Sequence, residues 1–311
     1  EIYTLSLHDA LPISISQEGN QGKPQFDLEA LKWYLDEHGI RIMFNDITQQ
    51  PSVRGFGSNY GTDNAIKALP SHIYGDLKCM YKGVTLNIIR EFIEVIAMDR
   101  MNHYNPVLDY FKTKHYDGGK HLAQVYQALH IEGDALSQLL VRKWFMQGWA
   151  LLYNDPDRPY GADGVLTLAG PQGIGKTTFF RKVAVLPEFF RAGQSISSRD
   201  KDNERRVVTT WIAELGEIGC TFKSDMDKVK QFITNERDEY RLSYARYDTS
   251  APRRTNMGAT VNGDEYLIDN TGNRRFWTVP LTDINLDLLD SIDFTQVWLE
   301  VYENYVKGQD I

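Results

Sequence analysis

The stretch from Gly170 to Thr178 has the residue types and spacing of a loop that binds phosphate. It reads Gly-Pro-Gln-Gly-Ile-Gly-Lys-Thr-Thr and follows the apolar run Val165–Ala169. Glycines let the backbone curl so that successive N–H groups point at anionic oxygens. In such a loop the lysine reaches the β- and γ-phosphates, and the threonine hydroxyl holds Mg²⁺. The pattern predicts a site for ATP and Mg²⁺ formed by Gly170, Gly173, Gly175, Lys176, Thr177 and Thr178.

Two carboxylates, Glu214 and Glu217, stand where such a loop needs them. Hydrolysis of ATP requires a carboxylate that organises Mg²⁺ and a base that orients water. Glu214 ends the apolar run Val207–Ala213, and open α/β sheets place their ligands at the carboxyl ends of strands. We assign Glu214, with Thr177, to Mg²⁺ and Glu217 to water activation; exchange or sharing of these two roles stays open. The alternative is a solvated acidic pair that opens a helix.

Three further residues suit phosphoryl chemistry. Asn262 closes the run Met257–Val261, and its amide can orient the attacking water without adding charge. Arg274 and Arg275 directly precede the run Phe276–Val279. Arginines so placed can stabilise charge on the transferred phosphoryl group, in the same subunit or in a neighbouring one. The alternatives are an Asn-Gly turn and a surface arginine pair.

Basic residues and tyrosines alternate between Glu217 and Asn262. The candidate nucleic-acid contacts among them are Lys223, Lys228, Arg241, Tyr244 and Arg246, with Arg253 and Arg254 beyond. Cations bind phosphates and aromatic faces stack on bases, so this composition is typical of a track for a single strand. The alternation from Tyr240 to Tyr247 predicts a hairpin. An edge hairpin whose tyrosines pack on the core is the alternative.

The elements that must position these residues alternate between strand and helix. Strands are expected at Val165–Ala169, Phe189–Ala192, Val207–Ala213, Thr255–Val261 and Phe276–Val279. An amphipathic helix is expected to follow the glycine loop, at Phe179–Val185. This alternation is typical of a parallel sheet with helices on both faces. We therefore expect the α/β class, with a P-loop NTPase core of the AAA+/ASCE-like kind.

The rest of the chain divides into shorter sections. Helices are expected at Phe26–His38, Thr85–Met98 and Ala135–Leu152, and polar turn residues dominate Asn45–Asp63. Residues 3–13 resemble the translation of a sequencing adapter, which indicates an artefact and a truncated natural protein. The expected domains are an artefact at 1–14, a small mixed α/β accessory domain at 15–104, a helical section at 105–158, the P-loop ATPase core at 159–290, and the start of a truncated C-terminal helical lid at 291–311.

Composition limits the class of protein. The 311 residues carry a formal net charge of −8, which argues against a uniformly basic nucleic-acid binder but permits a local basic channel. The two cysteines, Cys79 and Cys220, are too few for a disulfide framework or a zinc site, so we expect a reducing cytoplasm. No apolar run reaches the length of a membrane span, and we expect no membrane association.

The order of these motifs resembles the virulence-associated protein E family. The resemblance rests on the glycine loop, Trp211–Glu217, Tyr240-Arg241, Thr260–Asn262 and Gly272–Phe276, and it extends from about Phe26 to the C-terminus. It implies a P-loop ATPase of phages and mobile elements, similar to superfamily 3 replicative helicases and often fused to a primase. It also implies a homo-hexameric ring with ATP at subunit interfaces, single-stranded DNA in the pore, and Arg274 or Arg275 acting on the neighbouring subunit's nucleotide.

We therefore expect the core of an ATP-dependent DNA helicase that replicates a phage or mobile element in the bacterial cytoplasm. Its expected substrates are single-stranded DNA or a forked duplex, and a primase domain or protein is the expected partner. Two alternatives stay open, namely a non-translocating NTPase switch or packaging motor and a P-loop kinase for a small molecule. The paired glutamates, the asparagine and the arginines favour hydrolysis over transfer to an acceptor.

Overall fold

A computed structural model describes residues 22–57, 62–196, 201–216, 223–241, 248–262 and 273–308 of the chain. These residues form two compact units. The smaller unit comprises residues 22–46 and 50–104, and the larger unit comprises 47–49 and 105–308. Within the described part of the chain, no helix has both the length and the apolar character that crossing a membrane requires.

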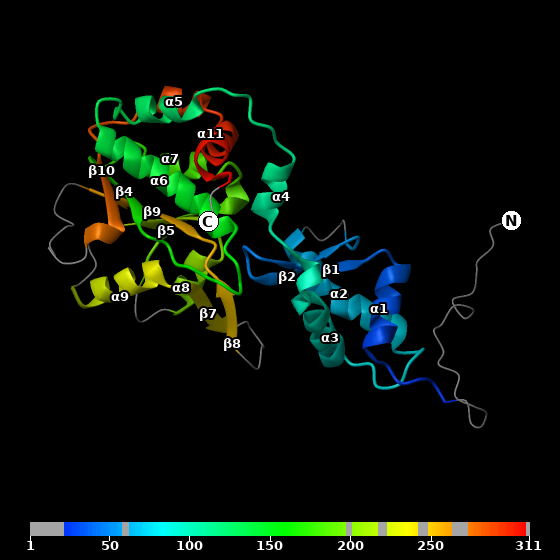
Figure 1. Ribbon diagram of the computed structural model, residues 1–311. Helices are drawn as coiled ribbons and strands as arrows, with labels where there is room; N and C mark the ends of the chain where they lie inside the picture. Colours follow the sequence, from blue (N-terminus) through cyan, green and yellow to red (C-terminus); the bar gives the residue numbers. More distant parts are fainter. Residues whose placement is uncertain are drawn as a thin grey trace. The chain divides into compact units, whose positions relative to one another are not determined.

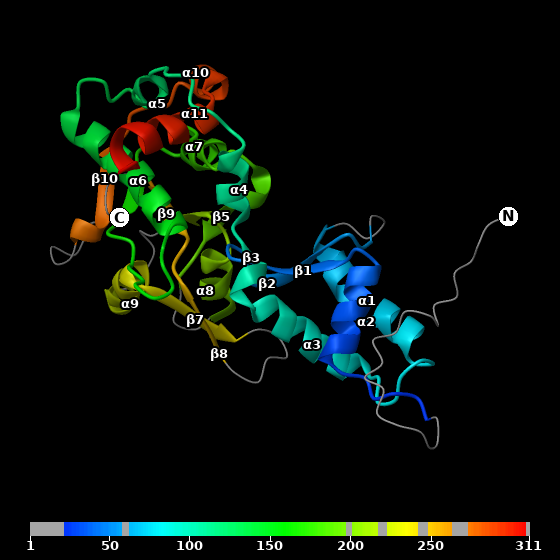
Figure 2. The ribbon, with the colours of Figure 1, turned by 45° about the vertical axis from the view of Figure 1, so that its right-hand side comes forward.

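The smaller unit is a three-stranded sheet covered on one face by helices (Figure 2). The sheet order is β2-β1-β3, with β1 and β2 antiparallel and β1 and β3 parallel. Its elements are α1 (Leu28–Glu37), β1 (Arg41–Asn45), β2 (Gln50–Arg54), α2 (Thr62–Leu77), α3 (Leu86–Met98), a 3₁₀ turn (Arg100–Asn102) and β3 (His103–Tyr104).

Sequence patterns account for most of this unit. Asp27 caps α1 by accepting a hydrogen bond from the Ala30 N–H at 2.9 Å, and Gly39 follows the helix with a left-handed φ of 62°. The expectation that polar turns fill residues 45–63 was wrong, because β2 lies within that range. Strand β2 is half-buried and polar, so it lacks the alternation that would have marked it.

The larger unit is built on a five-stranded parallel sheet (Figure 1). Its strands are β4 (Val165–Ala169), β5 (Phe190–Gln194), β6 (Ile212–Gly216), β9 (Asn256–Val261) and β10 (Phe276–Pro280), in the order β10-β4-β9-β6-β5. Its helices are α4 (Pro106–Lys112), α5 (His121–Ala128), α6 (Ala135–Leu152), α7 (Lys176–Val183), α8 (Lys201–Val208), α9 (Lys223–Thr234), α10 (Leu286–Ser291) and α11 (Phe294–Val301). Short helical turns lie at Pro187–Phe189, Asn273–Arg275 and Tyr302–Val306, and β7 (Arg237–Arg241) pairs with β8 (Asp248–Pro252) as an antiparallel hairpin. The expected α/β class and parallel sheet are confirmed.

Helices cover both faces of the parallel sheet, as the two ribbon views agree (Figures 1 and 2). Leu166 and Leu168 of β4 pack with α6, α7 and α11 in one core, whereas Val165 and Ala169 pack with α8 and α9 in another. Successive side chains of a strand point to opposite faces, which explains this division. The apolar positions of β4 thus face both layers, and the strand is buried throughout.

Tryptophan side chains connect the layers on the α6 face. The indole N–H of Trp144 donates to the Met257 carbonyl, that of Trp149 to the Trp298 carbonyl, and that of Trp298 to the Val183 carbonyl, at 2.7 to 2.8 Å. A buried indole N–H without a partner would be costly. These bonds therefore specify how α6, α11, α7 and β9 pack, in addition to the apolar area that the rings bury.

The strand expected at Val207–Ala213 was placed too early. Val207 and Val208 end helix α8, and the strand β6 begins at Ile212. Both valines are buried against the sheet in the α8–α9 core. The apolar run therefore joins two elements that bury the same core, and burial outweighed the strand propensity of the valines.

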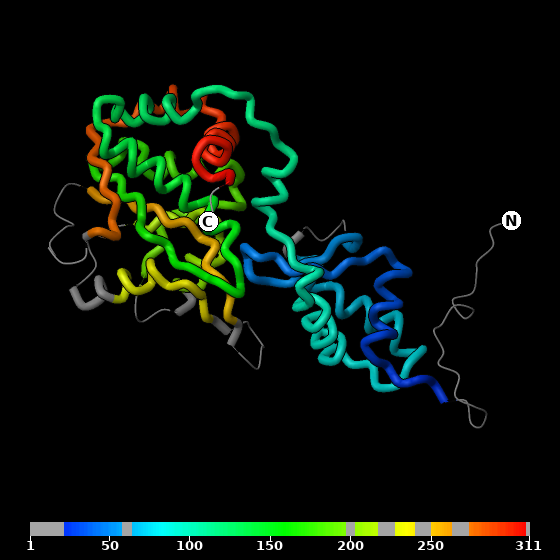
Figure 3. The backbone as a smooth tube through the Cα atoms, viewed as in Figure 1, coloured from blue at the N-terminus to red at the C-terminus, as the bar shows by residue number. Residues whose placement is uncertain are grey.

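A buried ion pair anchors the hairpin. The Asp238 carboxylate in β7 accepts three hydrogen bonds of 2.6 to 2.8 Å from Arg253, whose side chain is fully buried. Arg253 also donates to the Phe232 carbonyl at 3.1 Å and lies over the Phe232 ring. Arg253 belongs to the segment between β8 and β9, so the pair holds the hairpin to α9 and to the sheet. The path of the chain from the hairpin into the sheet can be followed in the tube of Figure 3. The prediction that Arg253 extends a basic nucleic-acid track was wrong, because its guanidinium is buried and paired with the Asp238 carboxylate.

Loss of one partner of this pair should destabilise the larger unit. We expect Asp238→Asn to lower the free energy of unfolding by about 3 to 5 kcal/mol, because the Arg253 guanidinium then stays buried without a counter-charge. Urea denaturation followed by tryptophan fluorescence measures the change. The exposed neighbour Glu239→Gln serves as control and should change stability little. A double variant, Asp238→Leu with Arg253→Met, should lose less than Asp238→Asn; an equal or larger loss would contradict this account.

Candidate nucleotide-binding site

The glycine loop connects β4 to α7 at the carboxyl edge of the parallel sheet. Gly175 has a φ of 100°, a left-handed conformation that favours glycine, and it directly precedes the first residue of α7. Gly170 lies so close to the chain that a Cβ there would meet the Leu281 carbonyl oxygen at 2.2 Å. Gly173, with a φ of 86°, lies in the exposed turn of the loop, and Thr178 lies half-buried in the first turn of α7. Helix α7 begins directly after the loop, and no side chain in the described structure caps its first N–H groups, which leaves them available to an anion.

Lys176 is held inside this loop. Its Nζ donates to the carbonyl oxygens of Gly170 and Pro171 at 2.7 and 2.6 Å, and to Asn262 Oδ1 at 3.2 Å. Only 6% of the residue is exposed, and burial lowers the pKa of its ammonium group. An ammonium has three donors and no acceptor, so these three oxygens match its capacity. Asn262, the residue after β9, therefore lies beside the Lys176 ammonium; its role in orienting water stays a prediction.

Glu214 is a buried carboxylate that accepts three hydrogen bonds. Its Oε1 accepts hydrogen bonds from the hydroxyls of Thr177 at 2.8 Å and Thr260 at 2.7 Å, and its Oε2 accepts from the Gly193 N–H at 2.9 Å. The residue is 2% exposed. Burial of an ionised carboxylate is costly unless hydrogen bonds replace its hydration, and these three bonds do so.

The strand order creates this cluster. Strand β9 lies between the loop strand β4 and the carboxylate strand β6, and Glu214 lies level with Gly258 of β9. Thr260 follows two residues later on the same face, so its hydroxyl lies beside the Glu214 carboxylate. Gly258 has no side chain to fill the space, and a Cβ there would meet the Phe180 ring of α7 at 2.1 Å. The helix that carries Thr177 thereby packs directly on β9.

The residues present fit a magnesium nucleotide. Mg²⁺ takes oxygen ligands at about 2.1 Å in octahedral geometry, so neighbouring ligands lie about 3 Å apart. The distance of 2.8 Å between Thr177 Oγ1 and Glu214 Oε1 matches such a pair. No group of three or more His, Cys, Asp and Glu side chains suited to a metal occurs among the described residues. One carboxylate and one hydroxyl suit an ion whose other ligands are phosphates and water.

The predicted arginines lie at the other end of the sheet. Arg274 and Arg275 directly precede β10, whose Phe276 lies level with Val165 at the start of β4. Because the two strands are parallel, the arginines lie where the strands begin (the amino edge of the sheet), whereas the glycine loop lies where β4 ends. A five-residue strand spans roughly 15 Å. Arg274 is exposed, and the buried Nε of Arg275 has no hydrogen-bond partner in the described structure. This geometry separates both arginines from the loop of the same chain.

The predicted nucleic-acid residues are only partly described. Lys228 is exposed on α9, whereas Lys230 of the same helix is buried. Lys223 begins α9 and Arg241 ends β7, but their side chains lie outside the described part, as do the residues Glu217, Tyr244 and Arg246 as a whole. The hairpin expected at 240–247 has its paired strands at 237–241 and 248–252. Arg254 donates to the Leu152 carbonyl at 2.6 Å and is half-buried.

Two donors to Glu214 escaped the sequence-based assignment. Thr260 stands two residues before Asn262, and its position near the end of an apolar strand was the available indication. Gly193 lies in β5, where the register against β6 shifts between Arg191 and Gln194. That irregularity, with a left-handed φ of 63° at Gly193, accompanies the N–H bond to the carboxylate. No local pattern in the sequence marks it.

Comparison with known proteins adds a family and a fold. A family model described as the virulence-associated protein E-like domain matches residues 111–311. Among curated proteins, none matches the chain. The chain is similar in fold to the A form apo structure of the NrS-1 C-terminal region, with 14% identity and a TM-score of 0.52. The match covers 86% of this chain and 68% of the NrS-1 chain. A second structure, of NrS-1 residues 305–718, covers 92% of this chain and 69% of its own, with 15% identity and a TM-score of 0.49. At such identity the similarity concerns the fold alone.

The Thr260 hydroxyl should matter for Mg²⁺-dependent turnover. If the chain hydrolyses ATP, we expect Thr260→Val to reduce turnover at least about ten-fold, because one hydrogen bond to a charged group is worth about 1.5 to 3 kcal/mol. Steady-state phosphate release at varied Mg²⁺ concentration measures the effect. Thr260→Ser keeps the hydroxyl and should retain most of the activity. Equal loss in the valine and serine variants would show that packing, rather than the hydroxyl, is important there.

Proposed function

We propose that this chain, which belongs to the virulence-associated protein E-like family, binds ATP with Mg²⁺ and hydrolyses it while acting on DNA. The observation that carries the proposal is the hydrogen-bonded set at the carboxyl ends of three adjacent strands. It joins Lys176 to Asn262, and Glu214 to both Thr177 and Thr260. Lysine, hydroxyl, carboxylate and amide are the groups that phosphoryl transfer from a nucleotide uses.

The lysine and the carboxylate would act by position and charge. Lys176 would exchange the carbonyl oxygens of Gly170 and Pro171 for phosphate oxygens, since its ammonium is buried and already oriented. Glu214 and Thr177 would hold Mg²⁺, which supplies charge neutralisation at the phosphates when it is bound. Thr260 and Gly193 would keep the carboxylate oriented through their hydrogen bonds.

In this proposal Glu217 activates the attacking water, and Asn262, which lies beside the lysine, helps to orient it. In the sequence, Glu217 is the residue directly after β6, the strand that carries Glu214. Asn262 is exposed and bonded to Lys176 Nζ, so its amide borders the space next to the lysine. A neutral amide can orient water there without repelling the nucleotide.

Arg274 and Arg275 enter the proposal from a neighbouring subunit. Their place at the amino edge of the sheet keeps them from the glycine loop of the same chain. A homo-oligomer, which we propose to be a hexameric ring, would bring the arginines of one subunit to the nucleotide of the next. Arg274, being exposed, is the better candidate for contact across such an interface.

The hairpin and α9 are the proposed contact with DNA. Lys223, Lys228, Arg241, Tyr244 and Arg246 would line the path of a single strand, and a forked duplex would be the substrate for unwinding. The proposed setting is replication of a phage or mobile element in the bacterial cytoplasm, with a primase as partner. A switch or packaging motor without translocation is the second candidate, because it would use the same nucleotide site.

Stimulation by DNA tests the proposed function. We expect ATP hydrolysis by the chain to rise at least several-fold with single-stranded DNA, and Lys176→Ala to abolish it because the phosphates lose their buried cation. Phosphate release with and without a poly-dT oligonucleotide measures this. Lys182→Ala, an exposed lysine on the same helix, is the control and should stay active. An ATP hydrolysis rate that does not change with DNA would support the kinase or another NTPase. Failure to unwind a forked duplex would support the switch.

Mixing of inactive subunits tests the arginines. Arg274→Ala lacks the arginine but keeps its lysine, and Lys176→Ala lacks the lysine but keeps its arginines. Each variant alone should therefore be inactive. A mixture should regain about a quarter of the wild-type rate if the arginine acts between subunits, because one interface in four would combine intact halves. The same mixture with Arg275→Ala identifies which arginine acts. A rate equal to the sum of the separate variants would exclude action in trans.

A further inference from the structure

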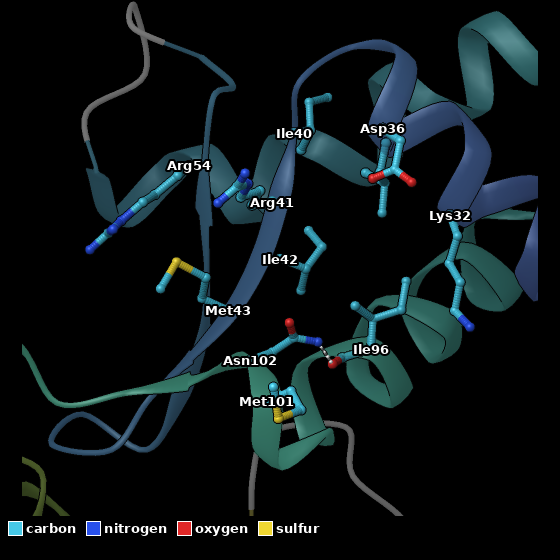
Figure 4. A pocket seen from close by; sticks show the side chains of 11 residues that line it. Lys32, Asp36, Ile40, Arg41, Ile42, Met43, Arg54, Ile96, Met101 and Asn102 are labelled. Carbon is cyan, nitrogen blue, oxygen red and sulfur yellow. Dashed lines mark hydrogen bonds between the residues drawn. The ribbon is translucent and has the colours of Figure 1, made fainter.

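The smaller unit contains a cavity of about 420 Å³ that the nucleotide site does not explain (Figure 4). Four consecutive residues, Ile40 to Met43, line it, and they include most of β1. The opposite walls come from α1, through residues such as Leu35, and from the end of α3 with the 3₁₀ turn that follows, through residues such as Ile96.

The cavity lies along an edge of β1. Successive side chains of a strand point to opposite faces, so four consecutive residues can border one space only if that space runs beside the strand. Strand β3 pairs only with Phe44 and Asn45 on that side. The Asp46 N–H donates to the Tyr104 carbonyl at 2.9 Å, so even-numbered residues of β1 direct their backbone groups to the β3 side. The backbone N–H and C=O of Ile42 therefore face the cavity.

The two sides of this edge differ in chemistry. Arg41 lies directly opposite Arg54 in the β1–β2 pair, so both guanidinium groups share the sheet face away from the core, where Arg54 also lies over the Tyr104 ring. Ile42 belongs to the core on the other face. With Lys32 and Asp36 on α1, the cavity lining carries three cations and one carboxylate.

We propose that this edge binds an extended segment of a partner protein whose acidic and aliphatic residues alternate. The segment would add a strand beside β1 and bond to the Ile42 backbone, as peptides do at open sheet edges. Its acidic residues would face Arg41 and Arg54, and its aliphatic residues would pack between Leu35, Ile42 and Ile96. Single-stranded DNA suits the cavity less well, because none of the described residues that line it is aromatic and could stack on bases. This inference does not depend on the proposed ATPase activity.

Fluorescence anisotropy with the 311-residue chain tests the proposal. The probe is a fluorescein-labelled peptide in which valine alternates with aspartate and glutamate over seven residues. We expect it to bind, and the double variant Arg41→Glu with Arg54→Glu to lower its affinity at least roughly ten-fold, since two attractive charges become repulsive. The matched control is Lys67→Glu with Lys78→Glu, two exposed α2-side lysines outside the cavity, which should change affinity little.

Methylated peptides separate strand addition from general charge attraction. N-methyl groups on alternate amides block one hydrogen-bonding edge of a peptide and keep every side chain. One of the two alternate sets should lower affinity at least roughly ten-fold, and the other set should not, because only one edge of an added strand faces β1. Equal effects of the two sets, equal effects of the two charge-reversed proteins, or displacement of the peptide by a dT oligonucleotide would each overturn the proposal.

Discussion

The buried carboxylate of Glu214 is the constraint on which the larger unit depends. A carboxylate that is 2% exposed needs donors in place of water, and here they come from α7, from β9 and from β5. These three elements are far apart in the sequence and adjacent to β6 or to its neighbours in space. The order β10-β4-β9-β6-β5 therefore serves the site, because insertion of β9 between the loop strand and the carboxylate strand supplies the Thr260 hydroxyl. A different order would leave the carboxylate with fewer partners.

Strand β9 connects this site to the hairpin through one short piece of chain. It ends next to Asn262, which bonds to Lys176, and it begins just after Arg253, which is paired with Asp238. Each residue of β9 pairs with β4 or β6, and Gly258, Ala259 and Thr260 pair with both strands. The lysine's partner Asn262 and the hairpin's anchor Arg253 therefore flank the two ends of one hydrogen-bonded strand. The hydrogen bond from the Trp144 indole to the Met257 carbonyl and the Phe180 ring against Gly258 hold the same strand from one face.

Much of this arrangement was predictable where local chemistry decides the structure. The glycine loop, the strand Val165–Ala169 and the helix Ala135–Leu152 follow from patterns within a few residues, and their bounds agree with the structure. The start of β6 was not predictable in that way, because the valines at 207 and 208 are equally suited to the end of a helix that buries them. The donors Thr260 and Gly193 lie 46 and 21 positions from Glu214, so only the sheet order reveals them. The position of Arg274 could have been derived once a parallel sheet was expected, because residues before a strand lie at the opposite side of the sheet from residues after it; the sequence analysis nevertheless left action within the same subunit open.

That separation of Arg274 from the glycine loop has a consequence for regulation under the proposed function. A lone chain would hold the lysine, the hydroxyl and the carboxylate but no arginine at its loop, since Arg274 lies at the opposite ends of the strands. Such a chain can be loaded with nucleotide and remain idle. Turnover would then begin at a threshold of local concentration, which DNA would set by gathering subunits on one strand. The fold would in this way protect the cell's ATP from copies of the protein that have not yet assembled on their template.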